Sequence, residues 1–406
     1  MVADLPPTLG RRTSFWVAAS VVAHTLWTSA APAMTYPLYA SEWNLTTTTT
    51  TAIFSIYPVV VVAVLICFGD LSDFIGRRAT MLMGLAASLA GILLFAVAPN
   101  VATIFVGRIL MGIGVGLSAS PSTAAMLEFS AKGQSHRASS IATAAQAIGF
   151  GSATLIGGAF IQYAPFPTRL NFWALFIVVS FIFCAVWFLP RHTAGETTGR
   201  WRPRSVSVPR GIRAIFATSA TSVTTAYVLG GMMLSLGAHI ARDVIGSSNT
   251  LVNGAAITLF ALIWAIVGIA AKKMPSRPAM MLGSIASVTA MALLMIASDR
   301  HTLPIFLGAS AVAGIAYSLM FLGGLGLINR NAPAHHRGAT LSAMFLIAYL
   351  MQGLVAFGLG AAATAGGLDF AINWGAGIIT VMSVAAILLT LFAGGGAARP
   401  PLATNP

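Results

Sequence analysis

Residues 69–78 read Gly-Asp-Leu-Ser-Asp-Phe-Ile-Gly-Arg-Arg, and this stretch decides the fold. Two acids at its start precede two arginines at its end. Gly69 permits close approach of a neighbouring helix, and Gly76 permits a backbone conformation that other residues resist. Asp73 can accept hydrogen bonds from a helix N-terminus or pair with an arginine. The pattern predicts a tight turn that acts as a conformational latch. The alternative is a solvated loop whose arginines only set orientation, which leaves the acids and glycines unexplained.

The chain around this loop is too apolar to be a water-soluble protein. Hydrophobic residues make up 57% of its 406 residues and charged residues 8%, whereas soluble domains carry roughly a quarter charged residues. Lipid must therefore be the solvent for most of the chain. The net charge of +13 sits in short runs between apolar segments, which indicates membrane orientation rather than nucleic-acid binding.

Apolar runs of about 20 residues predict twelve transmembrane helices. The predicted ranges are 14–38, 47–69, 79–98, 103–126, 139–162, 170–189, 213–238, 250–271, 279–297, 303–327, 339–363 and 371–393.

Basic residues orient these helices with both termini in the cytoplasm. The loops that this orientation places inside hold Arg11, Arg12, Arg77, Arg78, Lys132, Arg137, Arg191, Arg200, Arg202, Arg204, Arg210, Arg213, Lys272, Lys273, Arg277, Arg330, Arg337 and Arg399. The outer loops hold only Arg169, Arg242 and Arg300. This bias follows the positive-inside rule and predicts a multi-pass protein of the inner (plasma) membrane.

The chain divides into two related halves. Residues 1–190 form a predicted N-terminal six-helix bundle and 213–394 a C-terminal one, joined by a cytoplasmic linker at 191–212; residues 395–406 form a disordered tail. Short matches repeat about half a chain apart: His136-Arg137-Ala138 corresponds to His336-Arg337-Gly338. A shared offset of this kind is typical of parallel transporter repeats.

The decapeptide at 69–78 resembles the signature loop of the major facilitator superfamily. That loop runs Gly, any, apolar, Ser/Ala, Asp, basic, any, Gly, Arg, basic, and only Phe74 departs from it. The helix count, the linker and the half-repeat extend the resemblance over nearly the whole chain. The resemblance implies an all-α membrane protein with twelve transmembrane helices in two pseudo-symmetric six-helix bundles. It also implies alternating access to a central site for a small molecule.

The family fold would bring the end of the fourth helix and the start of the fifth close to this loop. We predict an inner-face charge network among Asp73, Arg77, Glu128 and Arg137, which closes the cytoplasmic side when the cavity opens outward. The alternative is a set of exposed ion pairs of little energetic value. The predicted latch comprises Gly69, Asp70, Asp73, Gly76, Arg77, Arg78, Glu128 and Arg137.

Arg108 falls inside the fourth predicted helix, where a charge costs at least roughly 2.5 kcal/mol near the bilayer centre. One interpretation is that it snorkels to the outer interface. Against it, the repeat position in the other half is Ala309. The segment also resembles the Arg-x-x-x-Gly-x-Gly pattern of proton-coupled exporters in the superfamily, which implies a role in proton coupling or anion binding.

His24 lies near the middle of the first predicted helix and can titrate near neutral pH. In the family fold that helix lines the cavity, so His24 could bind substrate or carry the coupled proton. The alternative is a buried histidine bonded to a carbonyl or a hydroxyl. The other predicted cavity-lining residues are Trp27, Thr28, Tyr36, Gln146, Tyr227, Tyr317 and Gln352, each of which is otherwise an interhelical hydrogen-bonding residue.

The acids lie at the ends of predicted spans or in loops, and none lies mid-span. Exporters of organic cations commonly use a buried acid. Its absence, with Arg108 and His24 present, favours neutral or anionic substrates. Transport of a permanently cationic dye that survives Arg108→Ala and His24→Ala would refute this.

The sequence therefore predicts a secondary transporter that exchanges protons for an exported small organic molecule. A proton-coupled importer or uniporter of a small neutral or anionic metabolite remains the alternative, because the Gly-Pro step typical of exporters is missing before Gly157-Gly158. A membrane enzyme lacks a convergent catalytic set, and a sensor lacks an extra soluble domain. The expected partners are substrate, protons and lipid around a monomer, without nucleic acid. We find no nucleotide-binding loop and no metal-ligand cluster, and we expect no cofactor.

Overall fold

The computed structural model describes residues 9–131, 135–191, 208–333 and 337–392. Within them the chain is helical and contains no β-strand. Most of the predicted linker and the predicted tail at 395–406 lie outside the described residues. Of the linker, Arg210–Ile212 form a short 3₁₀ helix, η2, that leads into the second half.

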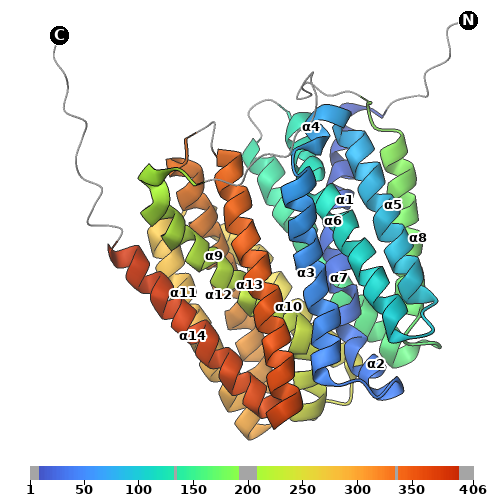
Figure 1. Cartoon of the computed structure of the whole chain (residues 1–406), viewed down its shortest axis with the longest axis vertical. Coiled ribbons are helices and arrows are strands. Elements are labelled where there is room, and N and C mark those ends of the chain that lie inside the picture. Colours follow the sequence, from blue (N-terminus) through green and yellow to red (C-terminus); the bar gives the residue numbers. More distant parts are fainter. Residues whose placement is uncertain (1–8, 132–134, 192–207, 334–336, 393–406) are drawn as a thin grey trace, which may run out of the picture.

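Twelve helices of 18 residues or more span the described chain (Figure 1). The first six are α1 (Arg11–Ala30), α3 (Thr47–Phe68), α5 (Arg77–Ala96), α6 (Val101–Phe129), α7 (Ser135–Tyr163) and α8 (Leu170–Trp187). The last six are α9 (Arg213–His239), α10 (Thr250–Ala270), α11 (Ser276–Arg300), α12 (Leu303–Asn331), α13 (Arg337–Gly366) and α14 (Leu368–Phe392). The shorter elements are η1 (Ala31–Met34), α2 (Tyr36–Glu42), α4 (Leu71–Ile75), the π-helical η3 (Ile240–Val244) and η4 (Ala271–Lys273).

The predicted first helix, 14–38, is broken rather than bent. Helix α1 ends at Ala30, a 3₁₀ turn follows, and α2 begins at Tyr36. Pro32 causes the break, because it has no N–H to donate to the helix and its ring clashes with the preceding turn. Pro37 sits in the first turn of α2, where a proline is tolerated.

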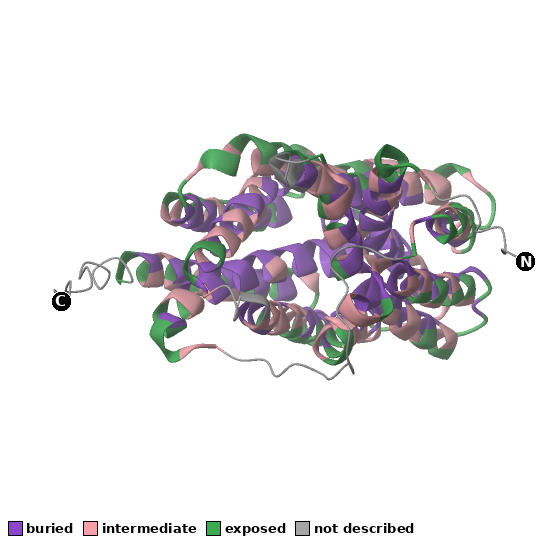
Figure 2. Cartoon of the chain, turned by 90° about the horizontal axis from the view of Figure 1, so that it is seen from above, coloured by how far each residue is buried: buried purple, intermediate pink, exposed green. Residues whose placement is uncertain are grey.

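Eleven helical segments of the described residues are long and apolar enough to cross a membrane. Helix α1 is the twelfth long helix and is not among them, because Arg11, Arg12, His24 and several Ser and Thr residues lower its hydropathy. In the other helices, apolar residues face the surroundings as well as the interior. Figure 2 shows the buried residues gathered where helices meet and the exposed ones around the perimeter.

The two halves repeat one packing pattern. In the first half α1 packs on α6 and α7, while α5 packs on α6 and α8. In the second half α9 packs on α12 and α13, while α11 packs on α12 and α14. The halves meet mainly through two helix pairs, α3 with α13 and α7 with α10. These two seams enclose the space in which the candidate site lies.

Candidate functional site

A cavity of about 820 Å³ lies between the two halves. Helices α1, α3, α6 and α7 line it from the first half, and α9, α10, α12 and α13 from the second. Its mouth is formed by Asp70 and Asp73 of the 69–78 loop, by Leu127, and by Asn329 and Ala339 across from them. The cavity is therefore open at the end of the molecule that carries this loop.

Hydrogen bonds between the halves close the opposite end. The Thr48 hydroxyl lies 2.8 Å from that of Thr364, which joins α3 to α13. The amide N–H of Thr250 donates to the side-chain oxygen of Gln162 at 2.8 Å, which joins α10 to α7. Arg242 donates to the Pro37 carbonyl oxygen at 2.9 Å. Each bond links residues of different halves, so this end cannot open while they persist.

Glycines let the backbones touch along the same seams. A Cβ at Gly254 of α10 would lie 2.2 Å from the Thr154 carbonyl oxygen of α7, and one at Gly158 would lie 2.7 Å from that of Thr250. Contacts this short exclude any side chain at either glycine. Gly149 similarly meets the backbone of Ala23 on α1. The glycines of α7 thus fit it closely to α1 and α10.

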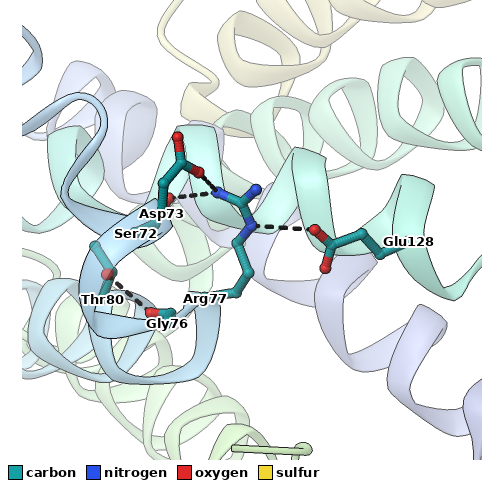
Figure 3. A network of polar contacts seen from close by, with 6 residues as sticks. All are labelled: Ser72, Asp73, Gly76, Arg77, Thr80 and Glu128. Atoms are coloured by element: carbon teal, nitrogen blue, oxygen red, sulfur yellow. Dashed lines mark hydrogen bonds and ion pairs between the residues drawn. The ribbon is translucent and has the colours of Figure 1, made fainter. Parts of the chain in front are cut away.

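The 69–78 loop contains a polar network (Figure 3). Arg77 donates to Asp73 at 2.5 Å and to the Ser72 hydroxyl at 2.7 Å, and its Nε lies 3.4 Å from Glu128 of α6. Gly76 has φ +91° and ψ 149°, a conformation that essentially only glycine adopts. All of these residues belong to the first half. These contacts therefore brace the first half.

The predicted latch also includes Arg78, Arg137 and Gly69. Arg78 is buried, donates to the Leu189 carbonyl oxygen at 3.2 Å and stacks over Trp187, so it fastens α5 to the end of α8. Arg137 is exposed near the start of α7. A Cβ at Gly69 would meet the carbonyl of Leu65 in its own helix. The expected approach of another helix at Gly69 is therefore wrong.

Arg108 caps the broken end of α1. It is fully buried and donates to the carbonyl oxygens of Ser29, at 3.0 Å, and Thr28, at 3.5 Å. Pro32 leaves the Thr28 carbonyl without its usual helical donor four residues on. The guanidinium carbon lies 4.6 Å from the ring centroid of Tyr57, a cation–π contact. Tyr57 lines the cavity and Arg108 does not. Because Arg108 is fully enclosed, the snorkelling interpretation is wrong.

His24 is 1% exposed, and neither ring nitrogen has a hydrogen-bond partner of good geometry in the described part of the chain. It does not line the cavity, because α1 turns Val22, Thr25 and Ser29 toward that space. At 100° per residue, His24 then points to another face of the helix.

Of the seven residues predicted to line the cavity besides His24, the structure places four there and three elsewhere. The four that line it are Gln146, Tyr227, Tyr317 and Gln352. The three that do not are Trp27, Thr28 and Tyr36. Trp27 and Thr28 lie on the far face of α1, and Tyr36 follows the break at Pro32.

Aromatic side chains form much of the cavity wall, a feature that we did not predict. Four of the seven tyrosines in the chain line it: Tyr57, Tyr227, Tyr317 and Tyr349. Phe54, Phe150, Phe260, Trp264, Phe321 and Phe345 join them. The available signal was the concentration of tyrosines on predicted helices, since a tyrosine in a span needs a partner for its hydroxyl.

Two helical halves around one central cavity, open at a single end, define a membrane transporter rather than an enzyme. Comparison with known families specifies the class: the family model of the Major Facilitator Superfamily matches residues 16–356, and the chain belongs to this superfamily. Its members bind small-molecule substrates and commonly function as monomers.

Two relatives extend the comparison. The chain is 31% identical over 164 residues to the multidrug efflux pump LfrA of Mycolicibacterium smegmatis, a match that covers 39% of this chain and 32% of the pump. It shares its fold with a bacterial homologue of the human lysosomal transporter Spinster, solved in an inward-facing, unoccupied conformation. That structure has a TM-score of 0.66 at 13% identity over 95% of each chain.

Proposed function

We propose that this protein is a secondary active transporter that exports a small organic molecule across the plasma membrane in exchange for protons. The observation that carries the proposal is the cavity, which lies between two halves, opens at the 69–78 loop and is closed at the other end. A single-ended cavity between two similar halves is the geometry that alternating access requires. With the basic loops in the cytoplasm, the open end faces inward.

Alternation requires one end to open as the other closes. The bonds between Thr48 and Thr364 and between Thr250 and Gln162 would break at the outer end. At the inner end Asp73 faces the first turn of α13 across the mouth, since both Asp73 and Ala339 line it. A helix N-terminus attracts a carboxylate. On closure, Asp73 and this turn would come closer together. The contacts that Arg77 makes with Asp73 and Glu128 would hold the carboxylate in position.

Proton coupling is assigned to Arg108 and His24. Both are buried in the first half, and His24 lacks a hydrogen-bond partner of good geometry among the described residues. A buried polar group without a partner costs roughly 1–3 kcal/mol, and a histidine can change charge near neutral pH. Arg108 holds the end of α1, the helix that carries His24 and lines the cavity. A change in the charge of His24 would therefore act on the helix that Arg108 fastens.

Export is favoured by the partial likeness to a multidrug efflux pump. Import or uniport is favoured by α7, where Gly157 and Gly158 are not preceded by the Gly-Pro step of exporters. The sign of proton movement separates the two directions.

The test measures proton movement in proteoliposomes that contain an internal pH dye. A panel of antibiotics, sugars and organic anions is added to wild type, to Arg108→Ala and to Arg12→Ala, which removes an exposed arginine. We expect a substrate-triggered pH change that Arg108→Ala abolishes and Arg12→Ala keeps, with the sign of antiport. The opposite sign would establish symport. Substrate flux without any pH change would refute proton coupling.

A further inference from the structure

Five aromatic residues of the cavity, all from the second half, form one connected set of rings. Tyr317 of α12 is its centre. The Tyr317 ring stacks with that of Phe321 at 6.1 Å between centroids and with that of Tyr227 at 6.3 Å. It meets Trp264 edge-on at 4.8 Å and Phe260 at 5.6 Å. We call this set of five rings the aromatic wall.

The backbone of α9 makes room for the wall. A Cβ at Gly230 would lie 3.1 Å from the Tyr317 ring, and one at Gly231 would lie 2.6 Å from the side chain of Gln352. Two adjacent glycines thus seat an aromatic ring and an amide that both line the cavity. The amide and the tyrosine hydroxyls supply donors and acceptors beside flat apolar faces.

On α1 and α6, across the cavity, most of the lining side chains are small. From α1 and α6 the first half contributes mostly small or hydroxyl-bearing residues: Val22, Thr25, Ser29, Val115, Ala119, Ser122 and Thr123. The space between such a face and the flat rings of the aromatic wall suits a planar ring system. Offset or edge-on contact between rings contributes roughly 0.5–1.5 kcal/mol beyond the area that is buried.

The charged residues at the mouth of the cavity differ in sign from the one behind its inner wall. The acids that line it, Asp70 and Asp73, lie at its mouth, and Asp73 is paired with Arg77. Deeper in, Arg108 lies behind the Tyr57 ring, and among the described residues it forms no ion pair with a carboxylate. An uncompensated positive charge in a medium of low dielectric constant acts strongly on a nearby ligand.

We propose that the aromatic wall is the substrate-binding surface and that it takes planar aromatic compounds that carry no positive charge. This inference rests on the proposed transport function and names its substrate class. The ring stacks on Tyr317, and polar substituents bond to Gln352 and the tyrosine hydroxyls. The positive charge behind Tyr57 then separates neutral and anionic ligands from cationic ligands of the same shape.

The test is equilibrium binding to the purified full-length protein in detergent, without any gradient. Three probes share the naphthalene ring system. They are the neutral naphthalene-2-carboxamide, the anion naphthalene-2-carboxylate and the cation (2-naphthylmethyl)trimethylammonium. We expect the neutral and anionic probes to bind at least about tenfold more tightly than the cation. Arg108→Gln should narrow that ratio, because it removes the charge.

Variants locate the site. Tyr317→Ala should weaken binding of the carboxamide at least about tenfold, while Tyr317→Phe, which keeps the ring, should stay within about threefold. Trp264→Ala, at another ring of the aromatic wall, provides a second test should Tyr317→Ala fail to fold, and Tyr163→Ala, at an exposed tyrosine outside the cavity, is the control. Preference for the cation, absence of binding by any of the probes, or equal binding to Tyr317→Ala would overturn the proposal. Because no proton gradient is present, failure of proton coupling leaves this result unaffected.

Discussion

Gly254 sits where the two halves touch at the closed end, and Gly254→Ala should force them apart. The new Cβ would lie 2.2 Å from the Thr154 carbonyl oxygen, whereas ordinary contacts begin near 3.4 Å. Helices α7 and α10 must therefore separate by about 1.2 Å (3.4 minus 2.2). The Thr154 oxygen is a backbone atom and the position of a Cβ is fixed by the backbone, so no rotamer change can relieve the contact. Overpacking of this kind costs about 1–3 kcal/mol.

This cost falls on the state that is closed at this end, because α7 and α10 belong to different halves. At tenfold per 1.4 kcal/mol, it shifts the conformational equilibrium by roughly 5- to 140-fold toward the state that is open there. Thr51 reports the shift. It is fully buried at the α3–α13 seam, where its hydroxyl would meet a Cβ at Gly360.

The assay is the labelling rate of Thr51→Cys by a hydrophilic maleimide, in a protein whose exposed Cys67 and Cys184 are replaced by serine. The rate should rise roughly 5- to 140-fold in Gly254→Ala, in proportion to the population that exposes the site. Gly308→Ala is the matched control, since a Cβ there meets open space on another second-half helix. Equal rates in Gly254→Ala and Gly308→Ala would refute the reasoning.

Three further predictions concern the two ends of the cavity. Asp73→Asn should slow transport up to roughly fivefold, because a partly exposed ion pair contributes about 0.2–1 kcal/mol; an unchanged flux and an unchanged labelling pattern would rule out the latch. Gly76→Ala should lower the thermal unfolding temperature, because its φ of +91° strains any other residue by about 1–3 kcal/mol; Gly377→Ala, in open space, should not lower it. The pair Thr48→Cys with Thr364→Cys should form a disulfide under mild oxidation, since the hydroxyls lie 2.8 Å apart. Flux should then stop and return on reduction, and flux that persists in the cross-linked protein would contradict alternation about this seam.

The sequence predicted the long helices and the loop well, because both depend on local chemistry. Lipid demands long apolar runs whose backbone groups are satisfied within the helix, so each predicted range overlaps a long helix, although the first, 14–38, is broken at Pro32. The Asp73, Arg77 and Glu128 contacts were predicted and are present; their action as a latch stays a prediction. The turn at Gly76 could be predicted because glycine is the one residue type that tolerates its backbone conformation.

The sequence predicted the cavity wall less well, because lining depends on how each helix is rotated. Trp27 and His24 share α1 with residues that line the cavity, yet face away from it. Tyr317 and Trp264 come from different helices, and the spacing of residues within either helix does not predict that their rings meet. The role of Arg108 required knowing that a proline 76 positions earlier frees a carbonyl beside it.

The composition of α1 bears on how the protein is made. It is the one long helix of the described chain that falls outside the eleven apolar spans, and its hydroxyls, His24 and the carbonyls at its broken end are tolerable in lipid only when other helices cover them. Insertion of this segment must therefore be completed by assembly with α6 and α7, whose Arg108 and Gly149 hold it. A helix that depends on its neighbours in this way cannot leave them during transport. During transport α1 must therefore move together with the rest of the first half. A substitution at Arg108 or Gly149 should reduce the amount of protein that reaches the membrane before it alters the transport cycle.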